Sequence, residues 1–284
     1  MHKAKGLPLY KKDEFCVPDC LKENPYILTG YRAQYTTGMC IRSFFALHNE
    51  TVNIWTHGIG FLVFVLLSLV LFTTVLLTHE YLAHTFVYGI FCFGCLMCMA
   101  CSTTYHLFLG HRNQLLSLVA QQLDYYGISV LIVVSFLPPL YIGFYCEPFF
   151  RAIYMTAICI CGVLSLVATS LPCLHDGKVR WVRICIYTAM ALSGVVPFFH
   201  HILLNPMNAE TLQTCGGVAL MFILYGMGTM IYCLRIPECW YPGEFDLLFS
   251  SHQIWHVFVL AAACVHFFTC TAIYQQWAVS RGAC

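Results

Sequence analysis

The chain has 284 residues, of which 60% are hydrophobic and 10% are charged, and its formal net charge is +1. A soluble domain carries about a quarter charged residues, so this composition excludes an ordinary soluble domain and predicts one transmembrane domain. We expect no nucleic-acid partner.

The chain divides into a predicted cytoplasmic tail over residues 1–39, a membrane domain over 40–278 and a short tail over 279–284. The first 23 residues hold five lysines and no apolar run, so we expect no cleavable signal peptide. Ile41, Phe44 and Phe45 recur at helical spacing just before the first apolar run. They predict a short amphipathic helix in the membrane interface, or else a continuation of the first span.

Seven apolar runs are long enough to cross a bilayer, which takes about 20 residues. They cover residues 57–77, 86–108, 122–144, 151–170, 182–203, 215–234 and 252–274. The predicted fold is therefore all-α, a bundle of seven transmembrane helices. Pro138, Pro139 and Pro197 lie inside spans, where they predict kinks rather than breaks. Most of the 18 cysteines lie in apolar runs, where a thiol behaves as a small hydrophobe, so they say little about redox compartment.

The distribution of basic residues predicts the orientation of the bundle. If the N-terminus is cytoplasmic, twelve Lys and Arg residues lie on the cytoplasmic side and two on the other side. The twelve are Lys3, Lys5, Lys11, Lys12, Lys22, Arg32, Arg42, Arg112, Lys178, Arg180, Arg183 and Arg235, and the two are Arg151 and Arg281. The positive-inside rule then predicts a cytoplasmic N-terminus and an extracellular or lumenal C-terminus. This orientation opposes a G-protein-coupled receptor, whose N-terminus faces outward.

Five polar side chains fall at one depth, at the predicted cytoplasmic ends of three spans. Ser102 and His106 share a helical face near the end of the second span. Asp124 lies in the first predicted turn of the third span, and His252 and His256 are one turn apart at the start of the seventh. Because ionisable groups are costly inside a membrane, each of these is a candidate functional residue.

Three histidines from two packed helices can offer the three nitrogens that catalytic zinc sites favour. We therefore predict that His106, His252 and His256 bind Zn²⁺, with water in the fourth position. Zinc can lower the pKa of bound water to about 7 and polarise a carbonyl oxygen. Asp124 would take a proton from that water or hold a bound histidine, with Ser102 as a further hydrogen-bond donor.

Other interpretations of these residues stay open. The histidines can bond backbone carbonyls at helix ends while Asp124 caps the third span, or Asp124 can be the fourth ligand of a closed structural zinc site. Glu50, Asn53 and His57 enter the first span at the same end, and they either buttress the site or cap and anchor the helix.

Four motifs follow one another along the chain. They are Glu50-Thr51-Val52-Asn53-Ile54-Trp55-Thr56-His57, Ser102-Thr103-Thr104-Tyr105-His106, Leu123-Asp124-Tyr125-Tyr126-Gly127 and Ser251-His252-Gln253-Ile254-Trp255-His256. From about Asn24 to about Tyr274 the chain resembles the progestin and adipoQ receptors, a family that includes the adiponectin receptors. The resemblance implies a seven-helix fold with the N-terminus inside and zinc held by the three histidines of these motifs.

Adiponectin receptors are linked to ceramidase-type hydrolysis, in which a fatty acid is released from a sphingoid base. The resemblance therefore implies a receptor-like signalling protein and a zinc-dependent hydrolase of lipid amides, with a ceramide-like lipid as substrate. In such an enzyme Asp124 would pass a proton to the leaving amine, with Ser102 beside it. Other branches of the family bind steroids.

The short tail and the run from Ser250 to His256 are most similar to the branch named for trapping Raf kinase at the Golgi. This closer resemblance implies a Golgi membrane protein, with the plasma membrane as the alternative location. It also implies an alternative function, a tether or scaffold that sequesters cytosolic signalling kinases such as Raf through its N-terminal region. The zinc would then be structural.

Overall fold

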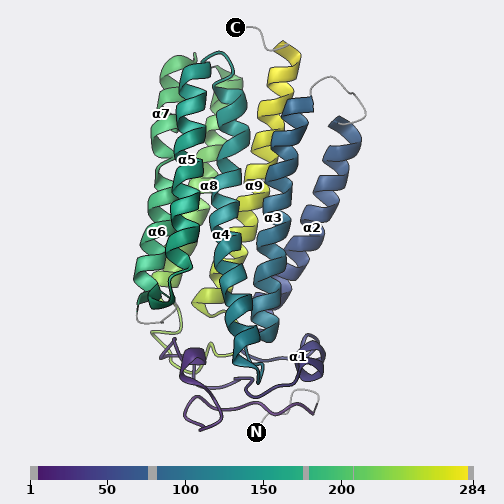
Figure 1. The fold of residues 1–284 in the computed structure, drawn as a ribbon, viewed down its shortest axis with the longest axis vertical. Coiled ribbons are helices and arrows are strands. Elements are labelled where there is room, and N and C mark those ends of the chain that lie inside the picture. Colours follow the sequence, from purple (N-terminus) through teal and green to yellow (C-terminus); the bar gives the residue numbers. More distant parts are fainter. Residues whose placement is uncertain (1–5, 76–81, 175–178, 207, 281–284) are drawn as a thin grey trace. The chain divides into compact units, whose positions relative to one another are not determined.

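The computed structural model describes residues 6–75, 82–174, 179–206 and 208–280, and the fold of this part of the chain is all-α, as predicted (Figure 1). Its helices are α1 (Thr37–Ser43), α2 (Thr51–Val75), α3 (Leu82–Phe108), α4 (Gln114–Gly143), α5 (Pro148–Thr169), α6 (Arg180–Leu192), α7 (Val195–Leu204), α8 (Ala209–Leu234) and α9 (Ser251–Ser280). Short 3-10 turns cover Asp19–Leu21 (η1) and Pro172–Leu174 (η3). Lys3, Lys5, Lys178, Arg281 and most of the predicted tail 279–284 lie outside the described residues.

Within the described residues, seven helical stretches are long and apolar enough to span a membrane, which confirms the predicted number. They are Thr51–Thr73, Thr85–Phe108, Gln114–Gly143, Pro148–Thr169, Arg180–Leu204, Ala209–Leu234 and Ser251–Val279. The first and third spans, which are α2 and α4, begin at Thr51 and Gln114, earlier than the predicted apolar runs, because their first turns carry polar side chains.

The proline predictions have different outcomes in the two spans. Pro138 and Pro139 lie inside the continuous helix α4. In the fifth span the prediction of a kink is wrong, because the helix ends at Leu192 and a new helix begins at Val195. Pro197 lacks the N–H that would bond the carbonyl four residues earlier, and its ring crowds that carbonyl, so the helix is interrupted just before it.

The described residues form two compact units, and each is described by itself. The first unit takes the described residues within Met1–Phe61, Met99–Tyr125 and Leu224–Leu260. The second unit takes the described residues within Leu62–Cys98, Tyr126–Ile223 and Ala261–Cys284. All five predicted site residues belong to the first unit.

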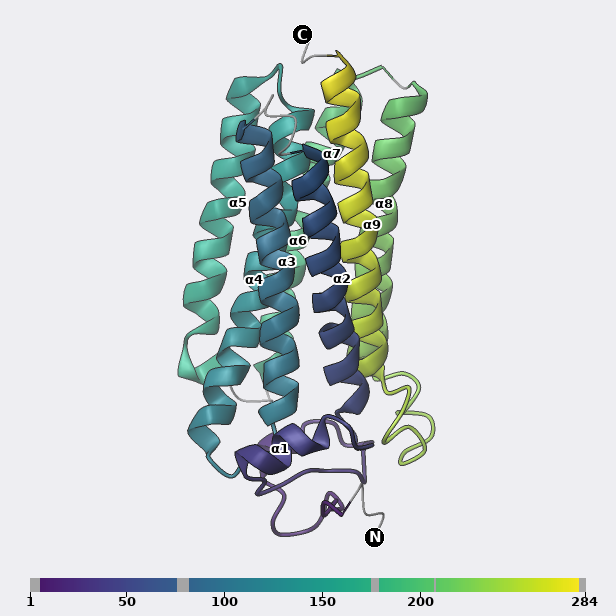
Figure 2. The same ribbon diagram turned by 90° about the vertical axis from the view of Figure 1, so that its right-hand side faces the viewer.

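In the first unit, residues 6–36 form a folded N-terminal segment. Val17, Ile27, Tyr31 and Ala33 are buried against one another in a small core of their own. The helix α1 follows this segment and lies crosswise to the parts of α2 and α3 that belong to this unit (Figure 2). Because α1 ends at Ser43 and α2 begins only at Thr51, α1 is a separate helix and not a continuation of the first span.

In the second unit, one feature of α4 bears on stability, and one feature of the connection that follows α4 bears on orientation. The Ser135 carbonyl has no amide partner four residues on, because Pro139 lacks an N–H. His266 of α9 bonds this carbonyl instead, with 2.7 Å between Nε2 and the oxygen. Cys146, in the connection between α4 and α5, is disulfide-bonded, so at least one cysteine is more than a small hydrophobe.

Candidate metal centre

Three of the predicted side chains come together in the first unit. The ligand nitrogens of His106 on α3 and of His252 and His256 on α9 all lie within 4.8 Å of one another. The ring centroids of His106 lie 5.2 Å from His252 and 4.7 Å from His256. His106 and His256 are buried, whereas His252 is half-buried. The three nitrogens are close enough to share one metal ion.

A carboxylate just before α2 orients His106. Glu50 Oε2 accepts a hydrogen bond from His106 Nδ1 at 2.7 Å and a second from Asn53 Nδ2 at 2.7 Å. A proton on Nδ1 leaves the lone pair of His106 Nε2 available to a metal. Burial acts to raise the pKa of the Glu50 carboxyl, but the hydrogen bonds from His106 and Asn53 and the electrostatic effect of His106 and His252 together outweigh it and hold that pKa below its usual value. Glu50 therefore buttresses the cluster and stays ionised.

The histidine cluster fits a metal better than it fits a hydrogen-bonded network. His106 Nε2 and His256 Nδ1 are buried and have no hydrogen-bond partner among the described residues. Buried polar atoms without partners are costly, and a metal ion would satisfy both. The ring of His57 on α2 stacks on His256, with centroids 3.9 Å apart, and fixes the plane of that ring. Three imidazoles are the donor set of an open zinc site.

The structure corrects the predicted position of Asp124. Asp124 is not in the first turn of its helix, because α4 begins ten residues earlier, at Gln114. Asn113 caps α4 instead, since its Oδ1 accepts a hydrogen bond from Leu115 N at 3.0 Å. Asp124 is buried and bonds Ser102, and it lies within electrostatic range of His106. It does not belong to the group of ligand atoms that lie within 4.8 Å of one another.

Residues that the sequence did not single out hold the ends of α3 and α9 in place. Arg32 is buried, and it donates hydrogen bonds to the carbonyls of His106 and Leu107 at the end of α3. Glu238 is fully buried and accepts hydrogen bonds from the amide and hydroxyl of Ser251, the first residue of α9. These contacts satisfy backbone groups that helix ends leave unpaired, and they fix the positions from which the histidines project.

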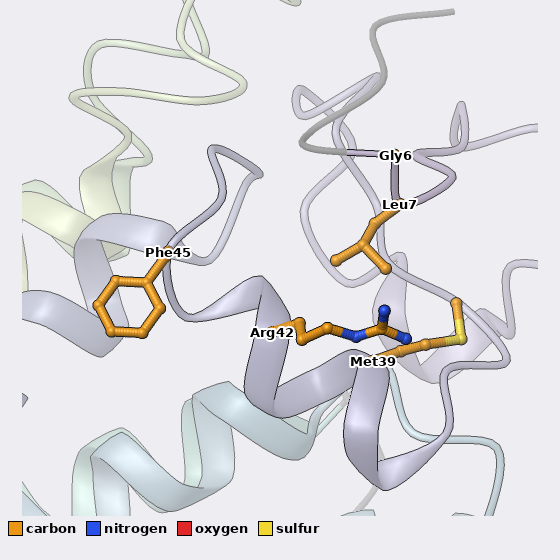
Figure 3. A pocket seen from close by; sticks show the side chains of 5 residues that line it. All are labelled: Gly6, Leu7, Met39, Arg42 and Phe45. Atoms are coloured by element: carbon orange, nitrogen blue, oxygen red, sulfur yellow. The ribbon is translucent and has the colours of Figure 1, made fainter.

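A hollow of about 430 Å³ opens elsewhere in the first unit, between the N-terminal segment and α1 (Figure 3). It is lined by Gly6, Leu7, Met39, Arg42 and Phe45. None of the three histidines lines it, so this hollow is not part of the histidine cluster.

The chain matches the family described as "Haemolysin-III related" over residues 45–267. The chain belongs to this family. It is 34% identical to heptahelical transmembrane protein 1 of Arabidopsis thaliana, over 92% of this chain and 80% of the relative. It is 33% identical to progestin and adipoQ receptor family member 3 of Mus musculus, over 95% of this chain and 86% of the relative.

A third relative is the adiponectin receptor protein of Drosophila melanogaster, which is 34% identical over 88% of this chain but over only 56% of its own length. These relatives confirm the resemblance to the progestin and adipoQ receptors. As a member of the haemolysin-III related family with seven membrane-spanning helices, the chain is an integral, multi-pass membrane protein of a receptor-like family.

Proposed function

We propose that this chain holds a zinc ion at His106, His252 and His256 and hydrolyses the amide bond of a ceramide-type lipid. The observation that carries the proposal is the gathering of three histidine nitrogens within 4.8 Å, two of them buried without a hydrogen-bond partner. Zinc, when bound, supplies a Lewis acid for the amide carbonyl and lowers the pKa of water.

The side chains around the cluster suit this chemistry. Glu50 holds His106 with Nε2 free, as the partners of metal-bound histidines commonly do. Asp124 is the nearby carboxylate, and it would hold and pass on a proton at its carboxyl oxygens. Ser102 bonds Asp124 and orients it. Since Asp124 stands outside the close group of ligand atoms, the arrangement favours an open metal position over a closed structural site.

The test measures zinc content and hydrolysis of a short-chain ceramide on the same detergent-purified sample. We compare wild type with His252→Ala and Asp124→Asn. Stoichiometric zinc that is lost in His252→Ala, with turnover lost in both variants, supports the proposal. Zinc without turnover would instead favour a scaffold that recruits a cytosolic kinase such as Raf, and a wild type without zinc would refute the metal site.

We also propose that the N-terminus is cytoplasmic. With this orientation, twelve of the 14 Lys and Arg residues would lie on the cytoplasmic side or in the first turn of a span that begins there. Three spans separate the N-terminus from Cys146, so Cys146 would then lie on the opposite side of the membrane. Its disulfide bond suits an oxidising lumenal or extracellular compartment. An epitope tag at residue 1 that is digested by protease in sealed, cytoplasmic-side-out vesicles supports this orientation.

The closer resemblance to the Golgi-trapping branch supports a Golgi location, and a fluorescently tagged chain that stains only the plasma membrane would refute it.

A further inference from the structure

The start of α9 carries two of the three clustered histidines, and it is anchored by a buried carboxylate. Glu238 lies in the loop of residues 235–250, called here the α8–α9 loop, and none of its surface is exposed. Its Oε2 accepts a hydrogen bond from Ser251 N at 2.8 Å, and its Oε1 accepts one from the Ser251 hydroxyl. His252 is the next residue in the chain, so Glu238 fixes the backbone from which the His252 ring projects.

The third donor to this carboxylate comes from far away in the sequence. Asn24 Nδ2, in the N-terminal segment, donates to Glu238 Oε1 at 2.9 Å across 214 residues of chain. The Asn24 side chain is itself held, because its Oδ1 accepts a hydrogen bond from Tyr26 N at 3.1 Å. A buried carboxylate is stable only when donors surround it, so Asn24 stabilises the group that anchors α9.

Other contacts join the same two pieces of chain. Asp246 of the α8–α9 loop accepts hydrogen bonds from Leu28 N at 2.9 Å and from Thr29 Oγ1 at 2.7 Å. Gly243 N donates to Tyr26 O at 3.0 Å. The N-terminal segment and the α8–α9 loop therefore form one hydrogen-bonded layer, and α9 begins from this layer.

We propose that Glu238 is a positioning residue for His252 and that Asn24 couples the N-terminal segment to the metal site. The inference rests on the proposed metal site but not on hydrolysis. Because coupling between two sites is reciprocal, metal binding must also stabilise the N-terminal segment against opening. A cytosolic partner that pulls Asn24 away from Glu238 would weaken metal binding.

The test measures the affinity of the full-length, detergent-purified protein for Zn²⁺ by competition with a chromophoric chelator. Direct partners of metal ligands typically contribute about 10- to 100-fold to metal affinity. Glu238 holds the residue next to a ligand and not the ligand itself, so we expect Glu238→Gln to weaken binding by the lower end of this range, about tenfold. Asn24→Ala removes one of three donors and leaves the other two, and we expect about a threefold loss, the size of one ordinary hydrogen bond. Asp19→Ala is the matched control, because this fully exposed carboxylate lies in the same segment.

The double variant separates coupling from general damage to the fold. If Asn24 acts through Glu238, the loss in Asn24→Ala/Glu238→Gln is smaller than the product of the two single losses. Hydrogen exchange supplies a readout independent of turnover. Zn²⁺ should slow exchange of the Leu28 amide in wild type, and it should do so less in Glu238→Gln.

The possible results separate this inference from the proposed function. If wild type binds Zn²⁺ and both single variants bind it as tightly as wild type does, the proposed coupling is wrong but the proposed metal site is supported. A loss of Zn²⁺ affinity in Asp19→Ala as large as that in Asn24→Ala would also overturn the proposed coupling. If Glu238→Gln does not fold, Asn24→Ala decides the question alone, and a wild type without Zn²⁺ affinity overturns both proposals.

Discussion

Glu50→Gln removes the charge of the carboxylate that receives His106 Nδ1 but keeps an oxygen that can accept a hydrogen bond. The bond measures 2.7 Å, and the Glu50 side chain is only 18% exposed, so water screens it weakly. Hydrogen bonds to charged groups contribute about 1.5–3 kcal/mol and ordinary ones about 0.5–1.5 kcal/mol, so the variant loses the difference, about 1–1.5 kcal/mol. At 1.4 kcal/mol per factor of ten, this range converts to about a 5- to 12-fold loss of metal affinity.

Competition for Zn²⁺ with a chromophoric chelator measures this loss in detergent-purified protein. Glu244→Gln is the matched control, because Glu244 is exposed and belongs to the same unit. A melting curve of each variant in chelator shows whether the fold has changed. If the Zn²⁺ affinity of Glu50→Gln lies within about twofold of the wild-type affinity, the loss is smaller than that expected for a hydrogen bond to a charged group. Glu50 then does not orient a metal ligand.

Three further predictions concern the same unit. Burial lowers the pKa of His48 to about 3 from its ordinary 6.5, so only the unfolded chain gains this proton as pH falls below 6.5. The free energy of unfolding therefore falls by roughly 1.4 kcal/mol per pH unit between these values, and pH-dependent melting should show a smaller fall in His48→Gln. A Cβ at Gly110 would lie 2.4 Å from the Arg32 carbonyl oxygen, so Gly110→Ala should cost about 1–3 kcal/mol and lower the melting temperature. Ser102→Ala should lower turnover roughly tenfold without changing zinc content, because only the bond to Asp124 is lost.

Each of these three predictions has a result that contradicts it. A pH dependence that is unchanged in His48→Gln would show that this ring does not stay neutral in the folded protein. Gly38→Ala is the control for Gly110, because a Cβ at Gly38 meets nothing within 4 Å, and equal melting of the two variants would contradict the clash. Loss of zinc in Ser102→Ala would place Ser102 in metal binding instead.

The sequence predicts the spans well because a bilayer imposes one length and one composition on every crossing helix. It also places His106 near His252 and His256, since counting spans assigns them to one membrane side. Asp124 is misplaced within its helix because polar first turns, such as the one capped by Asn113, do not register as apolar runs.

The side chains that hold the histidine cluster in place could not be predicted by counting spans. The contact between Glu50 and His106 joins residues 56 positions apart, and no periodicity marks it. Glu238 lies in a loop, where sequence gives no sign that a carboxylate is fully buried. Asn24 resembles an ordinary turn residue until the fold brings it to Glu238. The motif that begins at Glu50 was the available sequence signal, because it put Glu50 at the same end of the first span as the histidines.

The bond between His266 and the Ser135 carbonyl has a consequence for how this chain can vary. Pro139→Ala would supply an amide that competes with His266 for one oxygen, whereas loss of His266 alone would leave that oxygen without its donor. A backbone amide at position 139 and the His266 ring are thus alternative donors to the Ser135 carbonyl. We expect a substitution at either position to decide what is tolerated at the other, so that the pair changes together in divergent sequences.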